Sequence, residues 1–155
     1  MKPVIVPLAC LALVACGGPP PPPPEPTITL APGASTLTVR VERVKTDRGP
    51  VICDLFNAGD GFPGPSPIIG GSLRVEASKE PVCVWERLPA GDYAVSVIQD
   101  ENANGGLDNN ILGIPAEGYG ASNNVLPPTS APLWSDSRFA LDGTAPVTIT
   151  VRLLN

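Results

Sequence analysis

The sequence predicts an all-β fold, a single seven-stranded β-sandwich with Greek-key connections, and three observations support this prediction. The chain has 21 prolines and 16 glycines but only 5% aromatic residues, a composition that favours short strands and many turns over long helices. Apolar and polar residues alternate in several short runs, and turn sequences such as DRGP, LPAGD and LDGTAP separate these runs. With 155 residues and 43% apolar content, the chain is long enough for one such domain.

The first strand is predicted over residues 36–44, where Leu37, Val39 and Val41 fall on one face of an extended chain. The same alternation predicts six more strands, at residues 50–57, 71–78, 81–88, 92–99, 137–141 and 147–154. Two antiparallel sheets packed face to face would bury these apolar faces. Residues 100–136 interrupt the pattern, and we expect them to form a long loop excursion with a functional or structural role.

The N-terminus predicts export and lipid attachment. Residues 1–15 carry Lys2 and then an apolar run of about twelve residues, which is shorter than the roughly twenty needed to span a bilayer. Leu13-Val14-Ala15-Cys16 resembles the lipobox of bacterial lipoproteins, in which the cysteine thiol receives a diacylglyceryl group and the chain is cut before that cysteine. We therefore expect a lipoprotein signal peptide over residues 1–15 and lipidation at Cys16. Ordinary soluble secretion is the alternative.

Residues 16–35 are predicted to form a tether between the lipid and the domain. Six consecutive prolines in this stretch disfavour a helix and favour an extended polyproline II rod. Gly17 stands where an inner-membrane lipoprotein often carries Asp, so the resemblance to Gram-negative lipoproteins implies the outer membrane, with the protein facing the periplasm or the cell surface. The β-sandwich domain is then expected over residues 36–155.

Two cysteines, Cys53 and Cys83, remain for the mature domain, because Cys10 leaves with the signal peptide and Cys16 takes the lipid. Both follow the inward-facing sets of their predicted strands. In an exported protein, an isolated pair of this kind predicts a disulfide. Two buried thiols are one alternative, and a metal or redox pair is another, although it lacks a histidine or a CxxC spacing.

The charge distribution excludes one class of partner. The formal net charge is -5 and basic residues do not cluster, so we expect no nucleic-acid partner. Between Arg87 and Arg138 there is no lysine or arginine, and this stretch would attract cations unless it is simply a solvated acidic surface. The acidic residues in it are Asp92, Asp100, Glu101, Asp108, Glu117 and Asp136.

The segment DENANGGLDNN, residues 100–110, has the spacing of a calcium loop. Oxygen ligands are expected at alternate positions, and Ile111 stands where a helical EF-hand has its bidentate glutamate, so any affinity would be weak, on the order of 0.1 to 1 mM. The alternative is an Asx-rich turn whose side chains bind their own backbone amides. The predicted calcium ligands are Asp100, Asn102, Asn104, Gly106 and Asp108, with Glu117 or Asp92 completing the shell.

The sequence argues against an enzyme. With no histidine in the chain, a Ser-His-Asp or Cys-His arrangement and a histidine-bound catalytic zinc are excluded. Acid–base chemistry would fall to carboxylates such as Asp100 and Glu117, and nothing marks a sugar cleft beside them. Trp134 is a candidate stacking platform for a sugar ligand. The alternative is that Trp134 plugs one end of the sandwich.

Four motifs resemble a bacterial exported family, domain of unknown function 2141, over roughly residues 36–154. They are GDYA at residues 91–94, the loop at residues 100–108, LGIP at residues 112–115 and EGYG at residues 117–120. The resemblance implies a transthyretin-like sandwich and no established activity. Members of the family usually have a histidine before the first aspartate of the loop, and this chain has Gln99 there.

These observations predict an outer-membrane lipoprotein that acts as a binding or structural module. Calcium is its candidate cofactor, with the Asx-rich turn as the alternative for the same loop. We expect a monomer held to the membrane by its lipid anchor, with an envelope glycan or protein as its partner. The alternative is a calcium-dependent carbohydrate- or envelope-binding protein.

Overall fold

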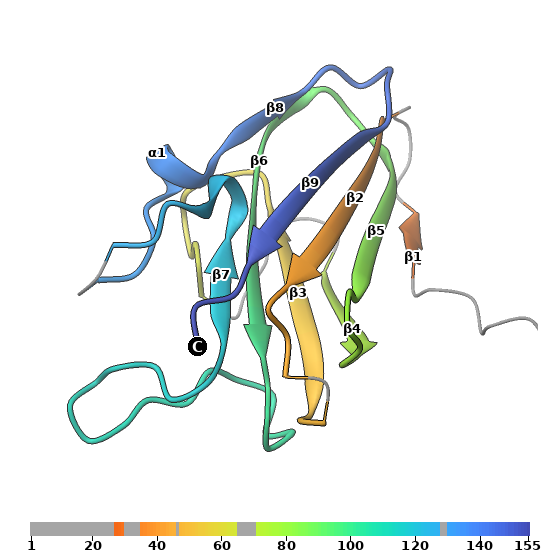
Figure 1. The fold of residues 1–155 in the computed structure, drawn as a ribbon. Coiled ribbons are helices and arrows are strands. Elements are labelled where there is room, and N and C mark those ends of the chain that lie inside the picture. Colours follow the sequence, from red (N-terminus) through yellow and green to blue (C-terminus); the bar gives the residue numbers. More distant parts are fainter. Residues whose placement is uncertain (1–26, 30–34, 46, 65–70, 128–129) are drawn as a thin grey trace, which may run out of the picture.

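A computed structural model describes residues 27–29, 35–45, 47–64, 71–127 and 130–155, and these form two packed β-sheets (Figure 1). The predictions for the signal peptide and for lipidation at Cys16 lie outside the described residues. Within the described ranges, no helix has the length and apolar character needed to cross a membrane.

One sheet has four strands in the order β1-β5-β2-β9. The central strands β5 and β2 are antiparallel, whereas β1 runs parallel to β5 and β9 runs parallel to β2. These strands are β1 (Thr27–Thr29), β2 (Ser35–Glu42), β5 (Val82–Leu88) and β9 (Val147–Arg152).

The second sheet has five strands and is antiparallel throughout its described pairings. Its order is β4-β3-β6-β7, and β8 also pairs with β6, which is the longest strand of this sheet. A single-turn helix, α1 (Trp134–Ser137), and a 3-10 turn, η1 (Ser122–Asn124), lie between β7 and β8. The strands are β3 (Pro50–Phe56), β4 (Ser72–Glu76), β6 (Gly91–Gln99), β7 (Tyr119–Ala121) and β8 (Phe139–Leu141).

The prediction of an all-β fold is confirmed, and each of the seven predicted strands is present. The predicted number is wrong, because β1 and β7 are additional strands. β1 lies in the stretch predicted to be the tether, and β7 lies inside the predicted loop excursion. Each is only three residues long, too short for an alternating pattern to indicate a strand.

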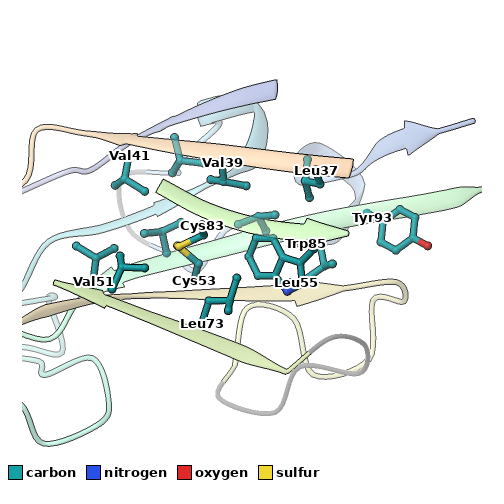
Figure 2. Packing of buried hydrophobic residues seen from close by; sticks show 14 of the residues in the cluster. Leu37, Val39, Val41, Val51, Cys53, Leu55, Leu73, Cys83, Trp85 and Tyr93 are labelled. Carbon is teal, nitrogen blue, oxygen red and sulfur yellow. A yellow bond between two sulfur atoms is a disulfide. The ribbon is translucent and has the colours of Figure 1, made fainter. Parts of the chain in front are cut away.

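The core lies between the two sheets and is made by the predicted alternation (Figure 2). Leu37, Val39 and Val41 of β2 are completely buried and face Val51 and Leu55 of β3 across the core. Strand β3 is buried on both of its faces. Residues outside the two sheets therefore cover the outer face of the five-stranded sheet at this strand. That outer cover forms part of the candidate site described below.

A disulfide joins the two sheets through this core, as predicted. Cys53 of β3 and Cys83 of β5 are completely buried, with their sulfur atoms 2.11 Å apart and their Cα atoms 6.6 Å apart (Figure 2). Trp85, also completely buried, lies beside the bond on the same face of β5. The covalent link therefore ties the centres of the two sheets together.

Replacing Cys53 and Cys83 together by alanine should lower the free energy of unfolding by about 3 to 4 kcal/mol, because the unfolded chain then regains the entropy of an open loop. Urea denaturation of the wild-type and variant proteins measures this difference. Reducing agent should destabilise the wild-type protein and leave the variant unchanged, which makes the variant its own control. Native protein whose two thiols react with a maleimide without reduction would contradict the disulfide.

Candidate ligand-binding site

Asp100 anchors the loop that follows β6, the acidic loop (residues 100–108). Its carboxylate is completely buried. One carboxylate oxygen, Oδ1, accepts a hydrogen bond from the amide of Asn104 at 2.8 Å. The other, Oδ2, accepts from the amide of Gly105 and from Nη2 of Arg74 on β4, each at 2.9 Å. A buried carboxylate requires such donors, since losing water without replacing its hydrogen bonds costs several kcal/mol.

Glu117 closes the acidic loop from its other end. It is buried, and its Oε1 accepts a hydrogen bond from the amide of Glu101 at 2.8 Å while Oε2 accepts from the amide of Asp108 at 2.9 Å. One carboxylate therefore bridges the first and last turns of the loop. Because Glu117 directly precedes Gly118 of the EGYG motif, these two hydrogen bonds also fix the point at which the chain enters β7.

Asn102 and Asn104 form Asx turns inside the acidic loop. Their side-chain oxygens accept hydrogen bonds from the amides of Asn104 and Gly106, at 3.1 and 3.0 Å. Their side-chain nitrogens donate to the carboxylate of Asp108. In each asparagine, the side-chain oxygen therefore accepts a hydrogen bond from the backbone, and the side-chain nitrogen donates one to Asp108.

In this structure the side chains of the acidic loop bind backbone amides and one another, whereas a calcium shell needs oxygens directed at one point. The carboxylates of Asp100 and Glu117 are occupied by amide and guanidinium donors, and nitrogens of the asparagines point at Asp108. Asp92, the other predicted final ligand, lies at the opposite end of β6 and pairs with Arg138 at 2.7 Å. No three His, Cys, Asp or Glu residues in the described parts of the chain form a group able to hold a metal ion. The geometry matches the Asx-turn alternative.

Residues 109–115 form a second feature, the apolar hairpin, which projects beyond β6 and β7 as the teal loop of Figure 1. Asn109 and Pro115 pair as a β-bridge at its base. The amide of Asn110 donates to the carbonyl of Ile114 at 2.8 Å, and the Asn110 side chain accepts from the amides of Leu112 and Ile114. These bonds give the hairpin a defined shape.

The tip of the apolar hairpin exposes large aliphatic side chains to solvent. Ile111 is 101% exposed, Leu112 is 76% exposed and Ile114 is 55% exposed. Three large exposed aliphatic side chains within four positions are unusual for a protein surface, and such a concentration makes the hairpin tip a candidate interaction site.

Between the apolar hairpin and the outer face of β6 and β7 lies a groove of about 600 Å³. Ser96 and Ile98 of β6 and Tyr119 of β7 form part of its floor, and Leu112 and Ile114 of the hairpin form part of its wall. None of the described residues that line the groove is charged. Residues 63, 96–98, 107, 109, 112–115, 119–120 and 130–132 line it.

Residues 39–150 match the model of a protein family described as "Uncharacterized protein conserved in bacteria (DUF2141)". The chain belongs to this family. The matched residues include the acidic loop, the apolar hairpin and the groove, so the candidate site lies inside the family domain. No curated protein and no solved structure matches the chain.

Gln99 has a structural role that sequence reasoning missed, since the position was noted only for lacking the histidine usual in the family. Its completely buried amide accepts from the amide of Lys45 at 2.9 Å and donates to the carbonyls of Lys45 and Arg48 at 2.6 and 2.7 Å. A neutral imidazole has one donor and one acceptor and cannot make all three bonds. Gln99 therefore fixes the β2–β3 loop, and a buried polar residue at the end of an apolar strand was the available signal.

Gly118 and Gly120 of the EGYG motif allow β7 to approach the C-terminal strand closely. A Cβ added at Gly120 would lie 2.7 Å from a methyl of Val151, and one added at Gly118 would lie 2.5 Å from the side chain of Asn155. Gly120 has no room for a Cβ, whereas the Asn155 side chain could move away from one at Gly118. This close approach accompanies the bridge between β7 and Leu154 beyond β9, which attaches the groove floor to both sheets.

Trp134, the predicted sugar platform, begins α1 and is half-buried against neighbouring aromatic residues. Its ring meets Phe62 edge-to-face with centroids 6.1 Å apart, and Phe62 in turn meets Phe56 of β3 at 5.2 Å. A Cβ added at Gly59 would lie only 3.2 Å from the Trp134 ring. This packing matches the alternative in which Trp134 plugs the end of the sandwich.

Asp54 is a buried acid beside the groove. It lies on the outer face of β3, directly between Ser72 of β4 and the groove residue Ser96 of β6 in the strand register. The hydroxyl of Ser72 donates to its carboxylate. Burial raises the pKa of Asp54 above its ordinary value, and the hydrogen bond from Ser72 offsets part of that rise.

Asp54→Asn should raise the melting temperature at pH 7 by roughly 4 °C, or about 1 kcal/mol. The folded state holds the Asp54 proton more tightly than the unfolded chain does, so the wild-type protein loses stability as pH rises from the unfolded pKa, about 4, through the raised folded pKa. Asparagine removes this penalty and still accepts from Ser72. The gain should shrink below about pH 4, where Asp54 is protonated. The exposed-site control Asp60→Asn should show neither effect, and a variant less stable than wild type at pH 7 would refute the prediction.

Calcium added to about 10 mM should leave the melting temperature unchanged, because the oxygens of the acidic loop already accept hydrogen bonds from the protein. A thermal-shift titration with magnesium as the parallel sample measures this. A rise specific to calcium that disappears in Asp108→Ala would instead establish the calcium site.

Proposed function

We propose that this chain is a lipid-anchored envelope protein whose β-sandwich binds a small apolar ligand in the groove. The groove itself is the observation that carries the proposal. Its volume of about 600 Å³ lies within the range of small-molecule sites, and the described residues of its lining are uncharged. The aliphatic side chains of Leu112 and Ile114 stand exposed on its wall, where a ligand would cover them.

Binding also benefits from the rigidity of the groove. Its floor is a pair of hydrogen-bonded strands, β6 and β7, and its wall is the apolar hairpin, whose preceding loop is held by the buried carboxylates of Asp100 and Glu117. A site formed in advance does not spend binding free energy on ordering its own loops. The packing of Trp134 against Phe62 favours an apolar ligand over a sugar, because its ring is used within the protein.

The proposed cellular location rests on the N-terminal sequence, in which the lipobox at Cys16 precedes a proline-rich tether. We place the protein at the outer membrane as a monomer, facing the periplasm or the cell surface. We also propose a transthyretin-like Greek-key arrangement for the sandwich. The hydroxyl of Tyr93 donates to the carbonyl of Pro89 at 2.9 Å, which closes the β5–β6 corner as tyrosine corners do in Greek-key sandwiches.

Cys16→Ala should release the protein from the membrane fraction, because the attached acyl chains together insert many methylenes at about 0.8 kcal/mol each. Fractionation of cells and mass spectrometry of the mature N-terminus measure the change. Cys10→Ala is the matched control and should leave the protein anchored. Wild-type protein recovered in soluble form without lipid would refute the proposed lipid attachment and membrane location.

Ala131→Trp should weaken binding of N-phenyl-1-naphthylamine, a neutral apolar dye, by at least about tenfold, because the new ring fills the groove that exposed Ala131 lines. Dye fluorescence titrated with purified protein measures the affinity. Val125→Trp adds the same ring at an exposed position outside the groove and should bind like wild type. A wild-type protein that does not bind the dye, or an Ala131→Trp variant that binds it equally well, would refute the groove as the site.

A further inference from the structure

Resting on the proposed function, we infer that the ligand of the groove is a single acyl chain of an uncharged or zwitterionic lipid. The structure further assigns the apolar hairpin as the surface that meets the lipid bilayer from which this chain comes. Three observations support these two inferences: the chemistry of the groove lining, the exposure of apolar side chains on both sides of the hairpin, and the charge of the residues that flank the hairpin.

The groove lining matches an aliphatic chain better than any other small ligand. Within the part of the chain that the structure describes, its walls are mainly aliphatic and proline side chains, and the half-buried Tyr119 is the one aromatic residue. Sugars and aromatic rings bind best between stacking faces, and among the described lining residues Tyr119 alone offers one. The hydroxyl of Ser96 donates to the carbonyl of Pro63, so this floor residue is already partnered within the protein. The described lining contains no lysine or arginine that would give an anionic headgroup a counter-charge.

The apolar hairpin is apolar on both of its sides. Leu112 and Ile114 line the groove, whereas Ile111 does not and is fully exposed to solvent. No ionisable residue lies between Asp108 and Glu117, so the tip can enter an apolar phase without burying a charge. A chain in the groove and a lipid surface at Ile111 would together cover all three exposed side chains of the tip.

The flanking charges specify the headgroup. Asp108 and Glu117 border the hairpin on either side, and the chain as a whole has a formal charge of -5. Glu101 on the acidic loop adds little to this field, because it is paired with Nζ of Lys45 at 2.5 Å. Anionic headgroups would be repelled by this end of the domain, whereas uncharged and zwitterionic ones would not. We therefore expect binding to phosphatidylcholine surfaces and weaker binding to phosphatidylglycerol surfaces.

The decisive experiment is a chain-length series. Monoacylglycerols of about 8 to 18 carbons, used as monomers, compete with the naphthylamine dye for the purified domain. Each added methylene should strengthen binding by up to about fourfold until the groove is full, after which the affinity should level off. A flat series in which Ala131→Trp still abolishes dye binding would overturn the acyl-chain inference and leave the proposed function intact. Failure of the wild-type protein to bind the dye at all would instead remove the proposed function.

Vesicle flotation tests the bilayer as the source, using protein produced from residue 17 onward so that it carries neither the apolar signal segment nor the lipid anchor. This protein should float with phosphatidylcholine vesicles, float less with phosphatidylglycerol vesicles, and lose flotation in the variant Ile111→Asp, which changes the exposed side of the hairpin and not the groove lining. Val125→Asp is the matched control, because it puts the same charge on an exposed apolar position outside the groove. A rising chain-length series with no flotation on phosphatidylcholine would overturn the assignment of the hairpin as a bilayer contact.

Discussion

The buried carboxylate of Asp100 is the interaction on which the candidate binding end of the domain depends. It is completely enclosed, and it is stable there because the guanidinium of Arg74 and the amides of Asn104 and Gly105 replace its water. Arg74 comes from β4, at the edge of the five-stranded sheet, so the contact ties the acidic loop to a strand far from it in sequence. Removing one partner would leave a buried charge unpaired, which is far more costly than losing an exposed ion pair.

Further contacts fix the loops that surround Asp100. The β2–β3 loop lies so close that a Cβ at Gly49 would stand 1.8 Å from the Asp100 carbonyl oxygen, and Gln99 holds that loop through three hydrogen bonds. Glu117 then ties the two ends of the acidic loop to each other. The apolar hairpin, which lies between Asp108 and Glu117, is therefore fixed at its base and can keep a groove open against the sheet. Rigid backbone hydrogen bonding at the base explains how a tip with exposed aliphatic residues stays in place instead of collapsing onto the groove.

The fold was largely predictable, because alternation of apolar residues and the inward positions of Cys53 and Cys83 are local properties of strands. The candidate site was less predictable from the sequence than the fold. A calcium loop and a series of Asx turns both need side-chain oxygens at nearly alternate positions, so the spacing from Asp100 to Asp108 predicts either, and only the directions of the asparagine amides distinguish them. The pairing of Arg74 with Asp100 and the assembly of the groove from distant segments depend on how the strands are ordered. One local signal was available, the apolar run ILGIP at residues 111–115 inside an otherwise polar loop.

Methyl NMR with a spin-labelled acyl chain tests the central claim most directly, since it reports where an aliphatic ligand sits on the intact domain. We expect the methyl signals of Ile98, Leu112 and Ile114 to broaden, because these residues line the floor and wall of the groove. The signals of Val125 and Leu154, which are exposed but lie outside the groove, should stay sharp. Broadening at Val125 and Leu154 without broadening at Leu112 and Ile114 would contradict the account.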